Sequence, residues 1–294
     1  MKIFDCTTYF DEELMMDVRF NILNEYVEKF IVVESKYSHS GKKKDLKFNI
    51  DNYKKFKDKI IYLTIEDEPE ELFQLNNNSD DSGRKRINSI KRIEQSYNRM
   101  LDGIDEASEN DLILISDNDE IPNLNSSQFK NSKNNIIIFK QLFFYFKFNL
   151  LYDYVPWFGT KGCKKKYLKS FSWLRNIKNK KYPFWRLDTY FSDLKIKNLD
   201  IINDGGWHFT NLKTPEQIFE KLSNYGHHNE FEESGITIDD IKNQIKNKIT
   251  VYDHKLDKNN PARSKFEYKL KKIENNSLPN YLVQNQAMYK DWFD

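Results

Sequence analysis

The stretch that most constrains the fold is residues 111–122, DLILISDNDEIP, in which an apolar run ends abruptly in acidic residues. A short apolar run bounded by polar residues is typical of a strand that is buried on both faces of a sheet. In open α/β sheets, ligands bind at the carboxyl ends of such strands. The pattern therefore predicts a buried strand with a binding site directly after it.

Three carboxylates, Asp117, Asp119 and Glu120, follow this strand. They repel one another, and burying them unpaired would cost several kcal/mol. A divalent cation is the simplest neutralising partner, and carboxylate oxygens suit Mg²⁺ or Mn²⁺. Asp117 and Asp119 form a D-x-D, whose two side chains share one face at a strand end. We expect a metal site on Asp117 and Asp119, with a solvated acidic turn as the alternative.

Strand-like and helical segments alternate along the first part of the chain. Apolar runs predict strands, and periodic apolar positions predict helices. The strands are expected at 3–6, 30–33, 60–64 and 111–116, and the helices at 11–27 and 84–104. This alternation predicts an α/β fold with a mostly parallel central sheet and helices on both faces. The length of 294 residues suits one large domain.

The charge balance and the cysteines exclude several classes of protein. The chain has 47 Lys and Arg against 45 Asp and Glu, so it lacks the basic excess of a nucleic-acid binder. Its two cysteines give no disulfide framework, which favours a reducing compartment. We find no signal peptide and no apolar run long enough for a transmembrane segment. These features predict a cytoplasmic protein.

Polar and aromatic segments add candidate features. Residues 66–83 are acidic and rich in Asn, which predicts a flexible loop that could act as a lid, and residues 257–260 form a polar break before Pro261. Residues 157–160, WFGT, could form a stacking floor for a sugar or could pack in the core. The lysines of residues 161–169 are expected to form a solvated face.

A second informative stretch is residues 203–210, NDGGWHFT. Its paired glycines let backbone approach closely or turn sharply. His208 could complete a metal site with the acidic pair, although a lone His in a strand is usually structural. Downstream, we expect a helix at 215–225 with Thr214 as its N-cap, then a polar loop that contains Glu230, and helices at 239–252 and 278–293.

Several of these segments together resemble glycosyltransferase family 17, the family of the β-1,4-mannosyl-glycoprotein N-acetylglucosaminyltransferases. The resemblance is carried, in matching order and spacing, by IFDC at 3–6, VVES at 32–35, HSG at 39–41, DNDEIP at 117–122 and GWHF at 206–209. It runs over nearly the whole chain. It implies a single GT-A type domain over 1–294, with a nucleotide-binding half at 1–122 and an acceptor-side half with C-terminal helices at 123–294.

The resemblance also implies an inverting transfer of GlcNAc from UDP-GlcNAc to a glycan acceptor, with Mn²⁺ or Mg²⁺ bridging the diphosphate. Inversion needs a carboxylate that takes the proton of the acceptor hydroxyl. Glu230 is the first candidate for this base and Asp204 the second. Asp5, Tyr9 and Glu34 lie at strand ends that should face uridine and ribose, and Arg99 could reach the diphosphate.

The chain departs from the family before the acidic strand, where it has EQSYNR at 94–99. The animal members are anchored in the Golgi membrane, and the lack of such an anchor here favours a bacterial or viral origin. Three alternatives remain: a transferase for another nucleotide sugar, a sugar nucleotidyltransferase and a non-catalytic carbohydrate-binding protein. TTYF at 7–10 stands where a nucleotidyltransferase usually carries a Gly-rich loop, and a binding protein would need no acidic triplet.

Overall fold

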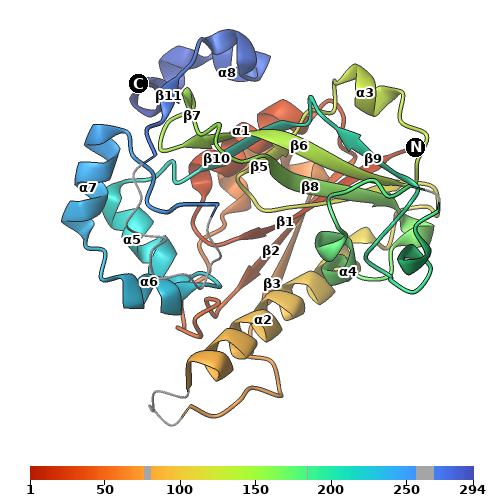
Figure 1. Cartoon of the computed structure of the whole chain (residues 1–294), viewed down its shortest axis with the longest axis horizontal. Helices are drawn as coiled ribbons and strands as arrows, with labels where there is room; N and C mark the ends of the chain where they lie inside the picture. The colour runs from red at the N-terminus through yellow and green to blue at the C-terminus, as the bar shows by residue number, and fades with distance from the viewer. Residues whose placement is uncertain (76–80, 184, 256–267) are drawn as a thin grey trace.

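A central sheet with helices on both faces forms the body of the computed structural model, which describes residues 1–75, 81–183, 185–255 and 268–294 (Figure 1). The strands are β1 Ile3–Tyr9, β2 Lys29–Ser35, β3 Ile60–Ile65, β4 Leu112–Ser116, β5 Glu120–Pro122, β6 Ile136–Tyr145, β7 Leu150–Leu151, β8 Trp157–Lys164, β9 Leu199–Ile202, β10 Gly206–Thr210 and β11 Lys271–Lys272. The α-helices are α1 Glu13–Leu23, α2 Asp81–Met100, α3 Ser127–Lys130, α4 Phe171–Asn176, α5 Pro215–Asn224, α6 His228–Ser234, α7 Ile238–Asn247 and α8 Asn280–Gln284.

The strand order of the sheet is β11-β7-β6-β8-β4-β1-β2-β3. Strands β3, β2, β1 and β4 are parallel, whereas β8 lies antiparallel between β4 and β6. Strands β9 and β10 run parallel to β6, and the short β5 pairs antiparallel with β10. The predicted α/β class and the four early strands are confirmed, and the antiparallel β8 makes the complete sheet a mixed one.

Two hydrophobic cores lie on opposite faces of the sheet, because successive side chains of a strand point to opposite faces. The face covered by α1 buries Ile3, Val32 and Leu114, together with Met16 and Phe20 of the helix. The face covered by α2 and α4 buries Cys6, Ile31 and Ile113, together with Met100 and Leu174. Each such side chain stabilises the fold by about 1.5–3 kcal/mol through removal from water. Near-continuous apolar runs are therefore required in β1, β2 and β4.

Helices α5, α6 and α7 form a separate cluster beside the carboxyl ends of the parallel strands (Figure 1). The loop after β2 reaches this cluster, because Ser40 Oγ donates a hydrogen bond to Asn224 Oδ1 at 3.2 Å. Thr214 caps α5 as predicted, and it forms a capping box with Gln217. The cluster thus closes over the edge of the sheet at which a ligand is expected.

Three predicted segments differ from the structure. The segment that contains Glu230 is helical, as α6, rather than a loop. Helix α7 stops at Asn247 instead of continuing to 252, because Lys248 adopts a left-handed conformation with φ of 56°. The aromatic segment at 278–293 divides into α8 and a 3₁₀ helix, Gln286–Trp292. Residues 76–80 of the predicted lid and the polar break at 257–260 lie outside the described residues.

No described helix combines the length and the apolar character that crossing a membrane would require.

Candidate active site

The acidic turn, residues 117–120, connects β4 to β5 at the carboxyl edge of the sheet. Its backbone closes through a hydrogen bond of 3.0 Å from Glu120 N–H to Asp117 O. Arg19 of α1 is fully buried and donates to Glu120 O at 2.6 Å. The same guanidinium forms two bonds with the Asp5 carboxylate, at 2.5 and 2.7 Å. Asp5, which is only 1% exposed, therefore supports the acidic turn through Arg19.

Asp117 and Glu120 share one arginine, Arg175 of α4. Its guanidinium contacts both oxygens of Glu120 at 2.8 Å and Asp117 Oδ2 at 2.7 Å. Glu120 is fully buried, whereas the side chain of Asp117 is 54% exposed. Asp117 is thus the acid of the turn that faces the solvent.

Asp119 is buried and lies between two cationic or potentially cationic groups. Lys221 Nζ of α5 lies 3.2 Å from Asp119 Oδ2, and His208 Nε2 lies 3.4 Å from Asp119 Oδ1. Burial opposes ionisation of this carboxyl, but Lys221 and His208 outweigh the effect and lower its pKa below the ordinary value. Burial likewise opposes the charge of Lys221, whose pKa is nonetheless raised because Asp119 and Glu12 lie close to it. The site therefore holds Asp119 as a carboxylate and Lys221 as an ammonium ion.

His208 reaches the acidic turn because β10 pairs with β5. His208 stands opposite Glu120 in this pairing, and Phe209 N–H donates to Asp119 O at 2.8 Å. The close approach of the two strands depends on Gly206, which has φ of 106° and where a Cβ would lie 2.2 Å from Ile121 O. The structure thus brings together Asp119 and His208, which lie far apart in sequence.

A cleft of about 230 Å³ opens beside Asp119, between the start of α1 and the segment from β10 to α5. Two lysines line it, Lys221 and Lys213, and Lys213 forms an ion pair with Asp11. Lys213 Nζ also lies 4.0 Å from Glu12 Oε1. The cleft therefore contains both acidic and basic groups, which pair with one another.

Asp119 and His208, two of the three predicted metal ligands, lie at a distance from each other that would allow both to bind one cation. Octahedral ligands at about 2.1 Å from an ion lie roughly 3 Å from their neighbours, close to the 3.4 Å between Asp119 Oδ1 and His208 Nε2. A carboxylate with an imidazole is also a donor set that Mn²⁺ accepts. Asp117 is turned towards Arg175, so the described part of the chain contains no group of three His, Cys, Asp or Glu side chains that is ready to hold a metal ion.

The residues predicted to contact the nucleotide have other partners. Glu34 is fully buried, and it accepts hydrogen bonds from Tyr62 Oη at 2.8 Å and from the backbone N–H of Phe48 at 2.9 Å. It anchors the loop after β2. Tyr9 packs its ring edge-on against Phe48, with the centroids 5.2 Å apart. Arg99 pairs with Asp102 at 2.5 Å, and its Nε donates to Thr64 O at 3.2 Å.

The two predicted bases lie in different surroundings. Glu230 lies in the first turn of α6, and its Oε1 forms a hydrogen bond of 2.9 Å with Nδ1 of His227. Burial raises its pKa, but the hydrogen bond from His227, the backbone N–H and the charges of His227 and Arg86 together lower it further, so the net shift is downwards and Glu230 is ionised. Asp204 accepts a hydrogen bond of 3.0 Å from Asn123 Nδ2. It precedes Gly206, which pairs with Pro122 at the end of β5 away from the acidic turn.

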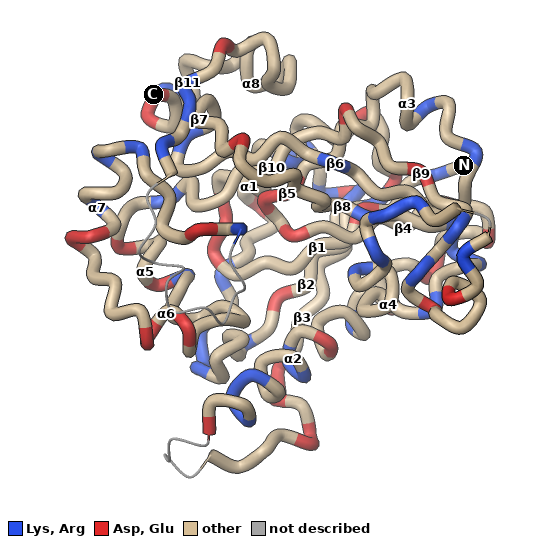
Figure 2. Tube along the Cα trace, in the orientation of Figure 1, with Lys and Arg blue, Asp and Glu red and all other residues tan. Residues whose placement is uncertain are grey.

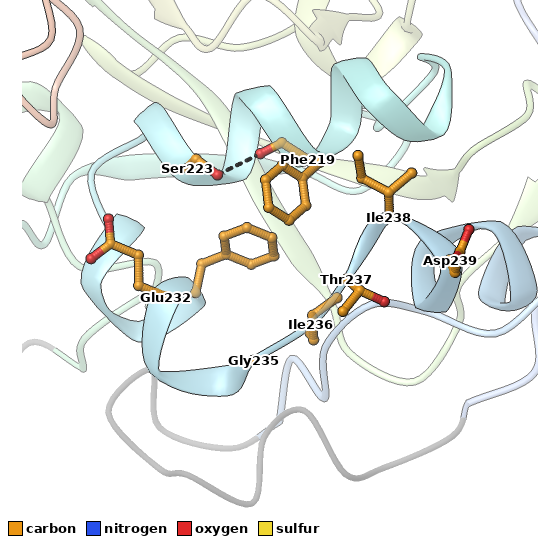
Figure 3. Close-up of a pocket in the computed structure, with 9 residues that line it drawn as sticks. Phe219, Ser223, Glu232, Gly235, Ile236, Thr237, Ile238 and Asp239 are labelled. Carbon is orange, nitrogen blue, oxygen red and sulfur yellow. Dashed lines mark hydrogen bonds between the residues drawn. The ribbon is translucent and has the colours of Figure 1, made fainter.

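A larger hollow of about 380 Å³ lies between α5, α6 and α7 (Figure 3). Figure 3 shows the ring of Phe219 beside Ile238, and Ser223 bonded to the backbone of its own helix. Phe219 and Phe231 pack with their ring centroids 5.2 Å apart. This hollow is mainly apolar and does not include any residue of the acidic turn. The smaller polar cleft is therefore the better candidate for the chemistry.

Sequence patterns did not reveal several residues of the site. Arg175 lies on a short helix after a lysine-rich segment, and nothing in the local sequence distinguishes it from the basic residues before it. The predicted solvated face of lysines is wrong for Lys161, which is buried and donates to the carbonyl oxygens of Arg175 and Ile177. The sequence predicts that Lys221 lies on a helix, because Thr214 marks the start of α5, but it does not predict that Lys221 contacts Asp119. Trp157 is a candidate sugar-stacking residue from its sequence context, but its contact with Glu120 depends on the pairing of distant strands.

Comparison with known families identifies the family to which the chain belongs. The family model for glycosyltransferase family 17 matches residues 1–293. None of the curated proteins matches the chain. The match covers essentially the full length and includes the acidic turn, His208 and both lysines of the cleft. The chain belongs to glycosyltransferase family 17, as its sequence motifs predicted.

Proposed function

We propose that this glycosyltransferase is an inverting, metal-dependent enzyme that moves GlcNAc from UDP-GlcNAc to a hydroxyl group of a glycan acceptor. The observation that carries the proposal is the contact of Asp119 with both His208 and Lys221, beside the polar cleft that Asp119 and Lys221 line. These residues come from β4–β5, β10 and α5, so the fold rather than local sequence assembles them. Membership of the family supports glycosyl transfer as the reaction.

The donor diphosphate is assigned to the two lysines of the cleft. Lys213 and Lys221 are each paired with a carboxylate, Asp11 and Asp119 respectively. Both would donate hydrogen bonds to phosphate oxygens and would stabilise the negative charge that develops as UDP leaves. The cleft is smaller than the roughly 300–1,000 Å³ of a typical ligand pocket, so it suits the diphosphate rather than the whole nucleotide sugar.

Asp119 and His208 would hold the divalent cation, and Asp117 would join them after release from Arg175. We propose Mn²⁺, with Mg²⁺ as the alternative, because one ligand is an imidazole. When bound, the cation supplies Lewis-acid stabilisation to the leaving diphosphate. The exposure of Asp117 supports this assignment, because its side chain can reorient without disturbing the buried Glu120.

The general base is assigned to Glu230, with Asp204 as the second candidate. Glu120 cannot serve, because all of its hydrogen-bonding capacity towards the site is used by Arg175, Trp157 and the backbone. Glu230 belongs to the helical cluster that also supplies Lys221, and its lowered pKa keeps it ionised as a base must be. Tyr9 and the loop anchored by Glu34 are proposed to border the uridine, and Arg99 is retained only as a more distant candidate.

The distribution of charge supports a small acidic ligand over a nucleic acid. Figure 2 shows acidic and basic positions interspersed along the whole trace. The formal net charge of +2 agrees with this pattern. A glycan acceptor and a nucleotide sugar are therefore the partners that we propose.

A donor screen by thermal shift in Mn²⁺ tests this function. UDP-GlcNAc, UDP-glucose, UDP-galactose, GDP-mannose and CMP-sialic acid are compared at equal concentrations. A ligand at 100 times its Kd stabilises a protein by about 2.7 kcal/mol, so the true donor should raise the melting temperature clearly. UDP release is then measured with and without a glycan acceptor.

Lys221→Ala and Lys242→Ala provide the matched pair for this screen. Lys242 is an exposed lysine of α7 that pairs with Glu216, so its removal should leave the shift unchanged. We expect a shift with UDP-GlcNAc that Lys221→Ala abolishes. Stabilisation by a different nucleotide sugar would reassign the donor, and no stabilisation by any of them would refute the proposed function.

A further inference from the structure

His208 lacks the support that usually orients a metal-binding histidine. Such a histidine normally donates its second ring nitrogen to a carboxylate, a carbonyl or water. Nδ1 of His208 is buried and has no hydrogen-bond partner among the described residues. The ring is instead held between two aromatic side chains. It stacks on Trp157 at 4.1 Å and 20°, and it lies against Phe143 at 4.5 Å and 32°.

The position of Trp157 is set by the acidic turn itself. Its Nε1–H donates to Glu120 Oε1 at 3.0 Å. The same oxygen accepts from Arg175 Nη2 at 2.8 Å, and the other oxygen accepts from Arg175 Nη1 at 2.8 Å and from Asp117 N–H at 3.0 Å. A chain of contacts therefore runs from Arg175 through Glu120 and Trp157 to His208.

The backbone of β8 is fitted closely around these groups. Arg175 Nη1 also donates to Gly159 O at 2.9 Å. A Cβ on Gly159 would lie 1.8 Å from Gln141 Oε1 and 2.9 Å from the carboxyl carbon of Glu120. A contact below 3.0 Å to a buried side chain forces something to move. The packing thus leaves the Glu120 carboxylate little freedom to change position.

We propose that Arg175, Glu120 and Trp157 are positioning residues, a relay that holds His208 and the acidic turn in the geometry needed for transfer. This inference rests on the proposed function for the role of His208, but the physical coupling stands on the contacts alone. By stacking, the indole holds the plane of the imidazole ring, which a hydrogen bond to Nδ1 helps to do at other metal sites. Loss of the indole N–H should therefore disturb both His208 and the turn.

Trp157→Phe and Arg175→Lys test the relay. Phenylalanine keeps an aromatic ring but loses the N–H donor to Glu120. Lysine keeps the charge but loses the planar fork that binds both carboxylate oxygens. The controls are Trp173→Phe, which removes an indole bond of 2.8 Å to Asp193 O, and Arg186→Lys, which changes an exposed pair with Asp188. The controls lie outside the cleft.

Amide hydrogen exchange is the readout that does not depend on activity. Peptides covering residues 117–122 and 206–210 should exchange faster in both relay variants and at the wild-type rate in both controls. Calorimetry with Mn²⁺ alone should show about 10–100-fold weaker binding, which is typical when a ligand-orienting group is lost. kcat should fall while the acceptor KM stays unchanged.

Unchanged exchange in the two peptides would overturn the relay. A lower melting temperature with wild-type Mn²⁺ affinity and wild-type kcat would also overturn it, because the three residues would then only stabilise the fold. If the wild-type protein binds no Mn²⁺ while the relay variants still exchange faster and have a lower kcat, the proposed metal site fails and the relay stands.

Discussion

Replacing Arg175 with methionine should destabilise the protein strongly, because it leaves Glu120 as a buried carboxylate without its cation. Glu120 is fully buried and receives two bonds of 2.8 Å from Arg175. Among the described residues, the indole of Trp157 and the backbone N–H of Asp117 would remain as donors to this carboxylate. Breaking a buried pair by removing one partner costs about 3–5 kcal/mol. The Asp117 contact adds little, because that side chain is 54% exposed and such pairs contribute about 0–1 kcal/mol.

A double-mutant cycle separates the cost of the orphaned charge from the loss of packing. Glu120→Gln replaces the carboxylate by a neutral amide that can still accept from Trp157. The double variant Glu120→Gln/Arg175→Met should therefore be more stable than the sum of the single changes, by about 1–3 kcal/mol. Urea unfolding followed by circular dichroism gives the free energies, with Arg186→Met as the exposed control, for which we expect a change below about 1 kcal/mol.

A loss below about 1 kcal/mol in Arg175→Met would show that the carboxylate is not held as its contacts indicate. If the free-energy changes of the two single variants simply add in the double variant, Arg175 and Glu120 are not energetically coupled, and the same conclusion follows. The free energy of unfolding of such a domain is about 5–15 kcal/mol, so the loss expected in Arg175→Met is large enough to measure. The milder Arg175→Lys variant, which keeps the positive charge, should remain folded.

Three further predictions concern single residues. His208→Ala should weaken Mn²⁺ binding by about 10–100-fold while changing the melting temperature less than Arg175→Met, and a Mn²⁺–UDP crystal structure with the imidazole well beyond about 2.0–2.3 Å from the ion would contradict this. Glu230→Gln should lower kcat by about 10²–10⁴-fold with donor affinity unchanged, whereas normal turnover beside an inactive, donor-binding Asp204→Asn would transfer the role to Asp204. Burial and the neighbouring Arg92 lower the pKa of His39 from 6.5 to about 4 in the folded protein. Between these pH values the unfolded chain binds a proton at His39 that the folded protein does not bind. The free energy of unfolding should therefore fall as the pH drops from 6.5 to 4. The full pKa shift of His39 corresponds to at most about 3 kcal/mol of unfolding free energy, and partial exposure of the side chain reduces this value. His39→Gln should flatten the pH dependence of the unfolding free energy, measured by urea titrations at several pH values.

The sequence specified the parts of the fold whose signals are local. Short apolar runs located β1, β2, β3 and β4, because strands that pack against helices on both faces of a sheet are mostly apolar. Their alternation with helices then gave the parallel region. The pairing of β8 with β4 and β6 was not foreseen, because an antiparallel insertion depends on contacts between distant segments.

The candidate site was predictable at its acidic centre and only partly around it. The D-x-D and the His in GGWH were chosen from composition and position, and β10 brings His208 to Asp119. Glu34 shows the limit of such reasoning. A residue at a strand end is at the right edge of the sheet, but the pleat decides which way it points, and Glu34 points into the protein. Arg175 and Lys221 were missed because their partners lie 58 and 102 positions away in sequence.

The most direct test of the account is calorimetric titration of UDP into the wild-type protein and Asp119→Asn, each with Mn²⁺ and with excess EDTA. Asp153→Asn, which changes an acid paired with Lys271 at the surface, is the control. Because Asp119 compensates the half-buried Lys221, circular dichroism must confirm that the variant is folded. The account predicts UDP binding that requires Mn²⁺ in the wild type and in Asp153→Asn, and that is lost in folded Asp119→Asn together with transfer. Full transfer activity in Asp119→Asn, or undiminished UDP binding and transfer in excess EDTA, would contradict the assignment of the acidic turn as a metal and donor site.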